Sequence, residues 1–321
     1  MASTVSILTN VSVCVSLVGC LLIIALNFRF REYRNNFFRN LVFILSIYDA
    51  LLSLAFLIPN SNRVMCDIQG HVLIGVALLP PHISAIISLL TYLKISKRVK
   101  LLKLRKISKV LHLIAVVHAI LMSTISIGSA KNYKFPHTNW CFAEAPGWLL
   151  SFYIFIWIDI LINIIFYSLI VNNIAATIKK YFRTTKTFLN SKSDTVHKKE
   201  IRLQLRMSII PLSLILALSW SSVKRVLELL NKDIPSWLNY MHAISNPSQG
   251  ISDCIVFVLL SSYSRKKLKE MFFCKPSVSV NFTTEEIEQS SLGSSRSENN
   301  GQFLDIQDEY KEKLLNTSSD S

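Results

Sequence analysis

Seven apolar stretches, each about as long as a membrane-spanning helix, run through this chain of 321 residues. A bilayer core about 30 Å thick is crossed by an α-helix of about 20 residues. Backbone polar groups in lipid must pair within the segment, so each stretch is predicted to be helical. The sequence therefore predicts an all-α membrane protein, a seven-transmembrane helix bundle with spans at 5–27, 40–58, 66–93, 110–130, 148–176, 208–230 and 238–260.

The charges between these stretches indicate how the bundle is oriented. On one side the connections carry 26 Lys or Arg residues, in the segments 28–39, 94–109, 177–207 and 261–275. On the other side they carry four, which are Arg63, Lys131, Lys134 and Lys232. Basic loops stay in the cytoplasm. We therefore expect the N-terminus outside and the C-terminus inside, in a multi-pass protein of the plasma membrane.

The chain divides into a basic part, residues 1–275, and an acidic tail, residues 276–321. The tail holds nine Asp or Glu and three Lys or Arg, with many Ser and Thr residues, and is predicted to be disordered. Bases placed between apolar spans favour membrane lipid and a cytoplasmic protein as partners over nucleic acid. Phosphate loops, metal-spaced His/Cys clusters and nucleophile elbows are missing, so we expect no enzyme, no cofactor and no metal site.

A short amphipathic segment follows the last span. Leu268, Met271 and Phe272 recur at helical spacing among lysines, which predicts an eighth helix lying in the membrane surface. Pro276 should end it. Cys274, beside the phenylalanines, is a candidate for palmitoylation.

Two cysteines lie on the expected outer side. Cys66 begins the third span, and Cys141 lies in the second outer connection. On the oxidising side of a membrane a disulfide between them is favoured over two free thiols. It would hold the second outer loop over the mouth of the bundle.

Polar residues within the spans are costly in lipid, so they are functional candidates. Asp49 lies in the second span, while Asn246, Gln249 and Asp253 share one face of the seventh. Pro247 lacks a backbone donor and should kink that helix. These five residues are predicted to form a polar core. It either joins the helices statically or rearranges as a switch.

Five further residues are candidates for a ligand pocket. Asp159 and Asn163 lie one turn apart in the fifth span, where they contact either a neighbouring helix or a ligand. Lys224, Arg225 and Glu228 end the sixth span, and Lys224 can pair with Glu228. The two cations either extend to lipid headgroups or form a positive vestibule for an anionic ligand.

Prolines interrupt the third span. Pro80 and Pro81 should break the hydrogen-bond ladder and open a bend, and we expect His82 to satisfy a freed carbonyl. His118 and His242 fall near span ends and carry no assignment, nor does His112. Residues 238–260 contain no Lys, and an opsin needs one there for its retinal Schiff base.

Three short motifs point to a known family. They are CDIQG at 66–70, WC at 140–141 and NPSQG at 246–250. They resemble the Cys-x-Ile-Gln-Gly, Trp-Cys and Asn-Pro-Leu-Gln-Gly motifs of the cyclic AMP receptors of social amoebae, the class E G protein-coupled receptors. The resemblance covers about residues 5–275. Asp253 departs from the family's Asn, Phe257 from its Tyr, and the paired prolines are not typical of it.

The resemblance implies a receptor that passes the signal of a small extracellular ligand to a heterotrimeric G protein. It also implies a disulfide between Cys66 and Cys141, and a tail that is phosphorylated by a receptor kinase and bound by an arrestin-like regulator. Cyclic AMP itself does not follow as the ligand. Basic residues of predicted helical extensions would meet the G protein or serve only as topology signals, namely Lys179, Lys180, Arg202 and Arg206. The alternatives are a secondary transporter or channel, and a receptor that signals without G proteins.

Overall fold

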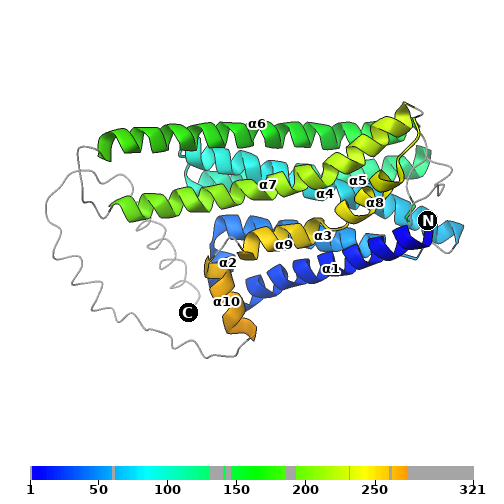
Figure 1. Ribbon diagram of the computed structural model, residues 1–321, viewed down its shortest axis with the longest axis horizontal. Coiled ribbons are helices and arrows are strands. Elements are labelled where there is room, and N and C mark those ends of the chain that lie inside the picture. Colours follow the sequence, from blue (N-terminus) through cyan, green and yellow to red (C-terminus); the bar gives the residue numbers. More distant parts are fainter. Residues whose placement is uncertain are drawn as a thin grey trace. The chain divides into compact units, whose positions relative to one another are not determined.

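The computed structural model describes residues 2–59, 62–129, 140–141, 146–185, 193–230, 232–259 and 262–272. For 177–185 and 193–208 it describes the backbone alone. The described part consists of α-helices joined by short non-helical segments, and its long helices run side by side as a bundle (Figure 1). In chain order the helices are α1 (Ala2–Arg29), α2 (Arg31–Asn35), α3 (Phe37–Phe56), α4 (Arg63–Ser96), α5 (Leu101–Ser129), α6 (Pro146–Thr185), α7 (Ser193–Leu229), α8 (Ser236–Ser245), α9 (Gln249–Leu259) and α10 (Ser262–Phe272).

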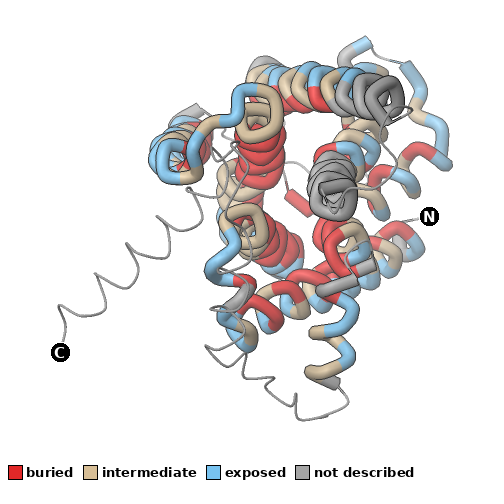
Figure 2. The backbone as a smooth tube through the Cα atoms, turned by 90° about the vertical axis from the view of Figure 1, so that its left-hand side faces the viewer, coloured by how far each residue is buried: buried red, intermediate tan, exposed pale blue. Residues whose placement is uncertain are grey.

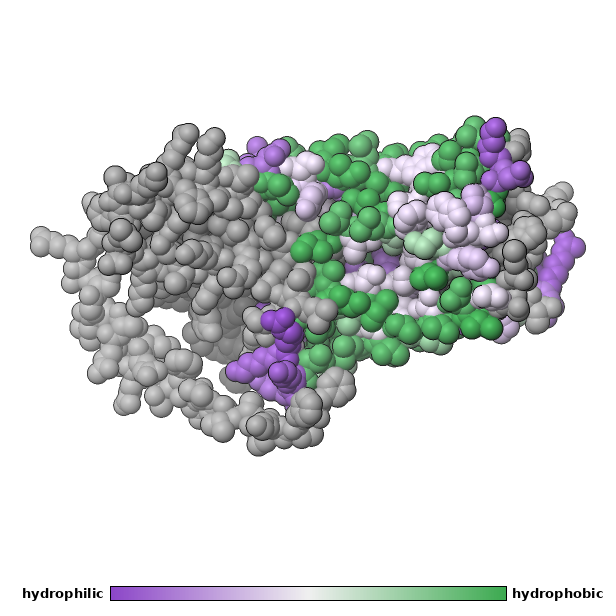
Figure 3. All heavy atoms as spheres, viewed as in Figure 1, coloured by the Kyte–Doolittle hydropathy of each residue, from purple (hydrophilic) through white to green (hydrophobic). Residues whose placement is uncertain are grey.

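Five of these helices are long and apolar enough to cross a membrane, namely α1, α3, α4, α5 and α6. Their outward faces are apolar as well. On α5, for example, Val110, Leu113, Val117 and Leu121 are each about half exposed or more. Figure 3 shows hydrophobic residues across the middle of the visible face and hydrophilic residues toward its ends. The prediction of an all-α membrane protein is confirmed at this level, since lipid rather than water suits such a surface.

The central helix is α4, which packs against α3, α5, α6 and α7. Leu78, Ile83 and Ile87 on α4 are fully buried, and Figure 2 shows buried residues facing the inside of the bundle. The α-helix α4 continues through Pro80 and Pro81, although neither proline has a backbone N–H to donate. Packing on several sides stabilises α4 at this point, where the helix lacks the backbone hydrogen bonds of two residues.

The helices extend further than the apolar stretches. The basic segment 94–109, expected to be a connection, is largely helical, since α5 begins at Leu101. The expected extensions of the fifth and sixth spans are present, with α6 running to Thr185 and α7 beginning at Ser193. The polar residues just after Ser193 had been expected in a loop and form the first turns of α7 instead.

The seventh apolar stretch is divided at the expected place. α8 ends at Ser245, α9 begins at Gln249, and the turn between them contains Pro247. Directly after the turn, the backbone N–H of Gly250 donates to Ser16 Oγ on α1 at 3.0 Å. A helix then forms at Ser262–Phe272, as the amphipathic pattern predicts.

Candidate functional site

A disulfide holds the one described piece of the connection between α5 and α6 against the bundle. Cys66 at the start of α4 is bonded to Cys141, as expected, with their Cα atoms 5.3 Å apart. The backbone N–H of Cys141 also donates to Gln69 Oε1 at 2.9 Å. Gln69 lies on the next turn of α4 and is fully buried. Two bonds therefore fix this segment to the same helix.

Trp140, the neighbour of Cys141, becomes part of the bundle interior. Its side chain is 3% exposed. The ring centroid lies 5.2 Å from that of Phe56 on α3 and 5.3 Å from that of His242 on α8. A residue of the outer connection thus joins two helices that are distant in sequence.

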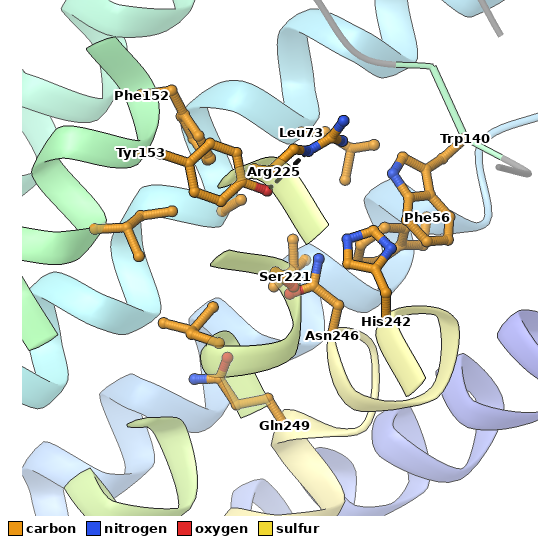
Figure 4. A pocket seen from close by; sticks show the side chains of 14 residues that line it. Phe56, Leu73, Trp140, Phe152, Tyr153, Ser221, Arg225, His242, Asn246 and Gln249 are labelled. Atoms are coloured by element: carbon orange, nitrogen blue, oxygen red, sulfur yellow. Dashed lines mark hydrogen bonds between the residues drawn. The ribbon is translucent and has the colours of Figure 1, made fainter. Parts of the chain in front are cut away.

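Beside Trp140 lies a pocket of about 550 Å³, part of which is open to solvent. Its apolar wall consists of Leu52, Phe56, Leu73, Ala77, Trp140, Phe152, Tyr153, Ile156 and Leu218. Its polar wall consists of Ser221, Arg225, His242, Asn246 and Gln249, which Figure 4 shows converging from two yellow-green and yellow segments, α7 and α8–α9.

Three atoms of the polar wall have no hydrogen-bond partner in the described part of the chain. They are Ser221 Oγ, His242 Nδ1 and Gln249 Nε2. All three side chains are at least 96% buried. Buried polar atoms are nearly always paired, and leaving one unpaired costs about 1–3 kcal/mol. Water or a ligand in the pocket can supply that partner.

The end of the pocket nearest the C-terminus of α7 is cationic. Arg225 Nη1 lies 2.5 Å from Glu228 Oε2, and Arg225 Nε donates to the Tyr153 hydroxyl at 3.4 Å. The guanidinium also faces the Tyr153 ring, 5.9 Å from its centroid. Lys224 Nζ is 3.9 Å from the other oxygen of Glu228. The expected Lys224–Glu228 pair is thus present, but the tighter partner of Glu228 is Arg225.

Lys224 does not extend to the surface. Its side chain is only 3% exposed, so the headgroup interpretation fails for this residue. It is close enough to His242 to interact with it electrostatically. Lys224 therefore contributes positive potential to the pocket from behind the polar wall.

Asp159 and Asn163 do not line this pocket, and of the two alternatives for them the structure has the contact with a neighbouring helix. Asp159 Oδ2 pairs with His82 Nδ1 on α4. Asn163 Oδ1 accepts a hydrogen bond of 2.6 Å from Ser88 Oγ, also on α4. Both side chains join α6 to α4, because buried polar groups are stabilised by direct partners on the neighbouring helix.

His82 also differs from expectation. It bonds to side chains rather than to a carbonyl freed by the prolines, since its Nε2 lies 2.8 Å from His118 Nδ1 on α5. Asp159, His82 and His118 therefore form a chain across α6, α4 and α5. His118 had been placed near a span end, but it lies well inside α5 because that helix begins earlier than its apolar stretch.

The predicted polar core is split in two. Asn246 and Gln249 line the pocket, whereas Asp253 lies one turn further along α9. Asp253 Oδ1 accepts a 3.0 Å hydrogen bond from Ser213 on α7. Its carboxyl group also interacts with that of Asp49 on α3, and both are at least 98% buried. Two carboxyl groups thus face each other where α3, α7 and α9 meet.

Some predicted residues cannot be placed in a site. Lys179 and Lys180 belong to α6, and Arg202 and Arg206 to α7, but only their backbone is described. Cys274 and the tail 276–321 lie outside the described residues.

Sequence reasoning missed several residues of the pocket. Ser221 and His242 each lie four positions before a residue that had been singled out, Arg225 and Asn246. Since residues four apart share a helix face, this spacing could have revealed them. Tyr153 carries no comparable signal, because one aromatic residue among many in an apolar span is not distinctive.

The arrangement of helices is similar to that in the crystal structure of squid rhodopsin. The TM-score is 0.67, with 16% sequence identity over 92% of each chain. No protein-family model and no protein of curated function matches the sequence. At this identity the likeness shows the fold. The chain is a multi-pass helical membrane protein with the fold of a G protein-coupled receptor.

Proposed function

We propose that the chain is a seven-transmembrane receptor that binds a small extracellular ligand and activates a heterotrimeric G protein. The N-terminus lies outside, and α7 and the divided helix α8–α9 supply the sixth and seventh spans. The observation that carries the proposal is the pocket beside Cys66–Cys141, whose buried polar atoms lack partners. The GPCR-like fold supports the same conclusion.

The pocket is connected to the interior of the bundle by short steps. Gln249 lines the pocket, and Asp253 lies one helical turn inward on α9. Asp253 bonds to Ser213 on α7 and faces Asp49 on α3. A ligand can only shift populations by binding one arrangement better than another. In our proposal this carboxyl pair is the element that rearranges, and Pro247 is the hinge between it and the pocket.

On the inner side, α6 and α7 extend well beyond their apolar parts. We propose that Lys179, Lys180, Arg202 and Arg206 meet the G protein there and that α10 lies on inner-leaflet lipid. Phosphorylation of the tail by a receptor kinase, binding of an arrestin-like regulator and palmitoylation of Cys274 complete the proposal.

The motifs CDIQG, WC and NPSQG support a place among receptors of the cyclic AMP receptor type in the plasma membrane. Residues of all three motifs have physical roles in the fold. Gln69 of the first bonds to Cys141 of the second, and Gly250 of the third packs closely against α1. These contacts explain the motif residues without specifying the ligand.

The test is nucleotide exchange on G proteins of the host, with the receptor in reconstituted vesicles. Cyclic nucleotides, folates and peptides are applied from outside. Ligand-dependent exchange supports the proposal. Solute flux across the same vesicles without any exchange would instead identify a transporter or channel.

A further inference from the structure

We propose that α2, α10 and the inner end of α1 bind a phosphoinositide, a lipid whose inositol headgroup carries several phosphate groups. The headgroup lies on the exposed bases of α2 and α10, and the acyl chains lie along α1. This inference rests on the proposed orientation of the receptor, in which these helices end at the cytoplasmic leaflet. It adds the class of lipid and the residues that recognise it.

The amphipathic helix α10 turns its apolar side chains toward the bundle. Leu268 and Met271 are partly buried and pack against the core cluster. Lys267 Nζ lies 4.9 Å from the ring centroid of Phe30, at the turn between α1 and α2, and 3.0 Å from Glu270 Oε2. A cation over an aromatic ring is attracted to it. These contacts hold α10 beside α2 at one end of the bundle (Figure 1).

The faces that these contacts leave exposed are basic. Arg31 and Arg34 lie three residues apart on α2, as do Lys266 and Lys269 on α10, and all four are exposed. Residues three apart share a helix face. Arg29, which ends α1, is exposed as well, and Figure 3 shows α10 as a hydrophilic patch. In the part of the chain that the structure describes, none of these five side chains forms an ion pair.

This cluster of bases favours a partner with several negative charges. Because α2 and α10 are packed against the bundle, their bases stay close together and repel one another, and a polyvalent anion removes that repulsion. A phosphomonoester carries a charge of about −1.5 to −2 and accepts paired hydrogen bonds from a guanidinium group. Clusters of Lys and Arg just inside a membrane are typical of phosphoinositide binding.

An apolar track on α1 leads to the bases and favours a lipid over a soluble phosphate. Val18, Leu21 and Phe28 are all more than half exposed, and their spacing of three and seven residues places them on one helix face. The Phe28 ring meets Phe43 of α3 edge to face, with centroids 5.7 Å apart. Arg29 follows directly. A lipid with its acyl chains along this track therefore places its headgroup at the bases.

Native mass spectrometry of the purified full chain in detergent tests the inference. It measures dissociation constants for three added probes: phosphatidylinositol bisphosphate, phosphatidylserine and inositol trisphosphate. Phosphatidylserine is a lipid with a single net charge, and inositol trisphosphate is the headgroup without acyl chains. We expect phosphatidylinositol bisphosphate to bind about ten-fold more tightly than either of the others.

Two triple variants with the same change of charge locate the site. One combines Arg31→Gln, Arg34→Gln and Lys269→Gln. The control combines Lys103→Gln, Lys106→Gln and Lys109→Gln, which are exposed bases of α5 on the same side of the membrane in the proposed orientation. Each base near an anionic surface contributes about five-fold to binding. The first variant should therefore weaken phosphoinositide binding by about ten-fold or more, and the control by about two-fold or less.

A single variant tests the apolar track. Phe28→Ser removes the exposed ring beside the bases, so it should weaken binding of phosphatidylinositol bisphosphate and leave binding of inositol trisphosphate unchanged. If inositol trisphosphate binds the unchanged protein as tightly as the lipid does, the occupant is a soluble phosphate and the inference is wrong.

Equal losses in the two triple variants, or equal binding of phosphatidylserine, would overturn the inference in favour of a general attraction between anionic lipid and basic segments. Loss of nucleotide exchange in the first triple variant with unchanged lipid binding would assign this surface to the G protein instead, and the proposed function would stand. Site-specific phosphoinositide binding by a protein that promotes no exchange would support the inference and contradict the proposed function.

Discussion

The side chain of Gln69 joins the backbone of Cys141 to the C-terminal end of α3. Its Oε1 accepts the Cys141 N–H at 2.9 Å, and its Nε2 donates to the carbonyls of Ile58 at 3.0 Å and Phe56 at 3.2 Å. A helix end leaves its last carbonyls without partners, so one amide satisfies both the helix and the disulfide segment. This contact places Trp140 against Phe56 at the edge of the pocket.

Replacing Gln69 by Leu should therefore destabilise the protein and weaken ligand binding together. The change leaves the Cys141 N–H and the α3 carbonyls without their partner, at a cost of about 1–3 kcal/mol for each buried group left unpaired. Thermal unfolding of the purified protein, with the disulfide checked on a non-reducing gel, measures the effect. Gln69→Glu keeps an acceptor for the Cys141 N–H but loses the donor to the α3 carbonyls. Its unfolding temperature should lie between those of the unchanged protein and Gln69→Leu only if both halves of the contact stabilise the fold. An unchanged unfolding temperature in Gln69→Leu would contradict this account.

Gly250→Ala should disrupt the contact between α9 and α1. A Cβ at this position would lie 2.2 Å from Cys20 Sγ and 2.7 Å from Ser16 Oγ. Overpacking of this kind typically costs about 1–3 kcal/mol. Gly75→Ala is the matched control, because its nearest contact would be 3.1 Å, and it should be tolerated better.

A double variant separates this clash from loss of backbone freedom. Cys20→Ala removes the sulfur that the new methyl group would meet, so Cys20→Ala combined with Gly250→Ala should regain part of the lost stability. The double variant is measured by thermal unfolding beside both single variants. If the stability losses of the two single variants add up in the double variant, the Cys20 sulfur is not what the new methyl group clashes with.

The sequence predicts the helical, membrane-spanning character of this chain because a bilayer imposes a simple requirement of length and polarity. It also predicts the disulfide, since Cys66 and Cys141 stand out as cysteines at the outer ends. The predicted ends of the helices agree less well with the structure. The basic residues before Val110 interrupt the apolar stretch but not the helix, because long basic side chains outside the lipid are compatible with helical structure.

The partners of buried polar residues were predicted less well. Asp159 and Asn163 stand out in the sequence, yet nothing in their spacing shows that α4 supplies His82 and Ser88 to meet them. That pairing depends on the rotation of each helix in the bundle, which hydrophobic periodicity specifies poorly when a helix is apolar on all sides. The pocket residue His242 was missed for a different reason, since its spacing of four to Asn246 does place both residues on one helix face.

Asp253→Asn should raise the stability of the protein. Asp253 and Asp49 are neighbouring carboxyl groups, each at least 98% buried, and a carboxylate buried without a cation costs free energy. The amide keeps an acceptor for Ser213 Oγ and cannot ionise. We expect the midpoint of thermal unfolding at neutral pH to rise by several degrees. Ser213→Ala, which removes the donor to Asp253, should lower it. A lower midpoint in Asp253→Asn would mean that the carboxyl pair stabilises the fold.

His82→Leu should destabilise the protein strongly because it leaves Asp159 buried without its partner. Leaving one member of a buried hydrogen-bonded pair without its partner typically costs about 1–3 kcal/mol, and more when that member is charged. Asp159→Leu alone should also be harmful, since His82 would keep only its contact with His118. The combined variant should be more stable than either single variant, because no unpaired charge remains between α4 and α6. A double-mutant cycle on chemical unfolding measures this coupling, and zero coupling would show that Asp159 and His82 do not act as a pair.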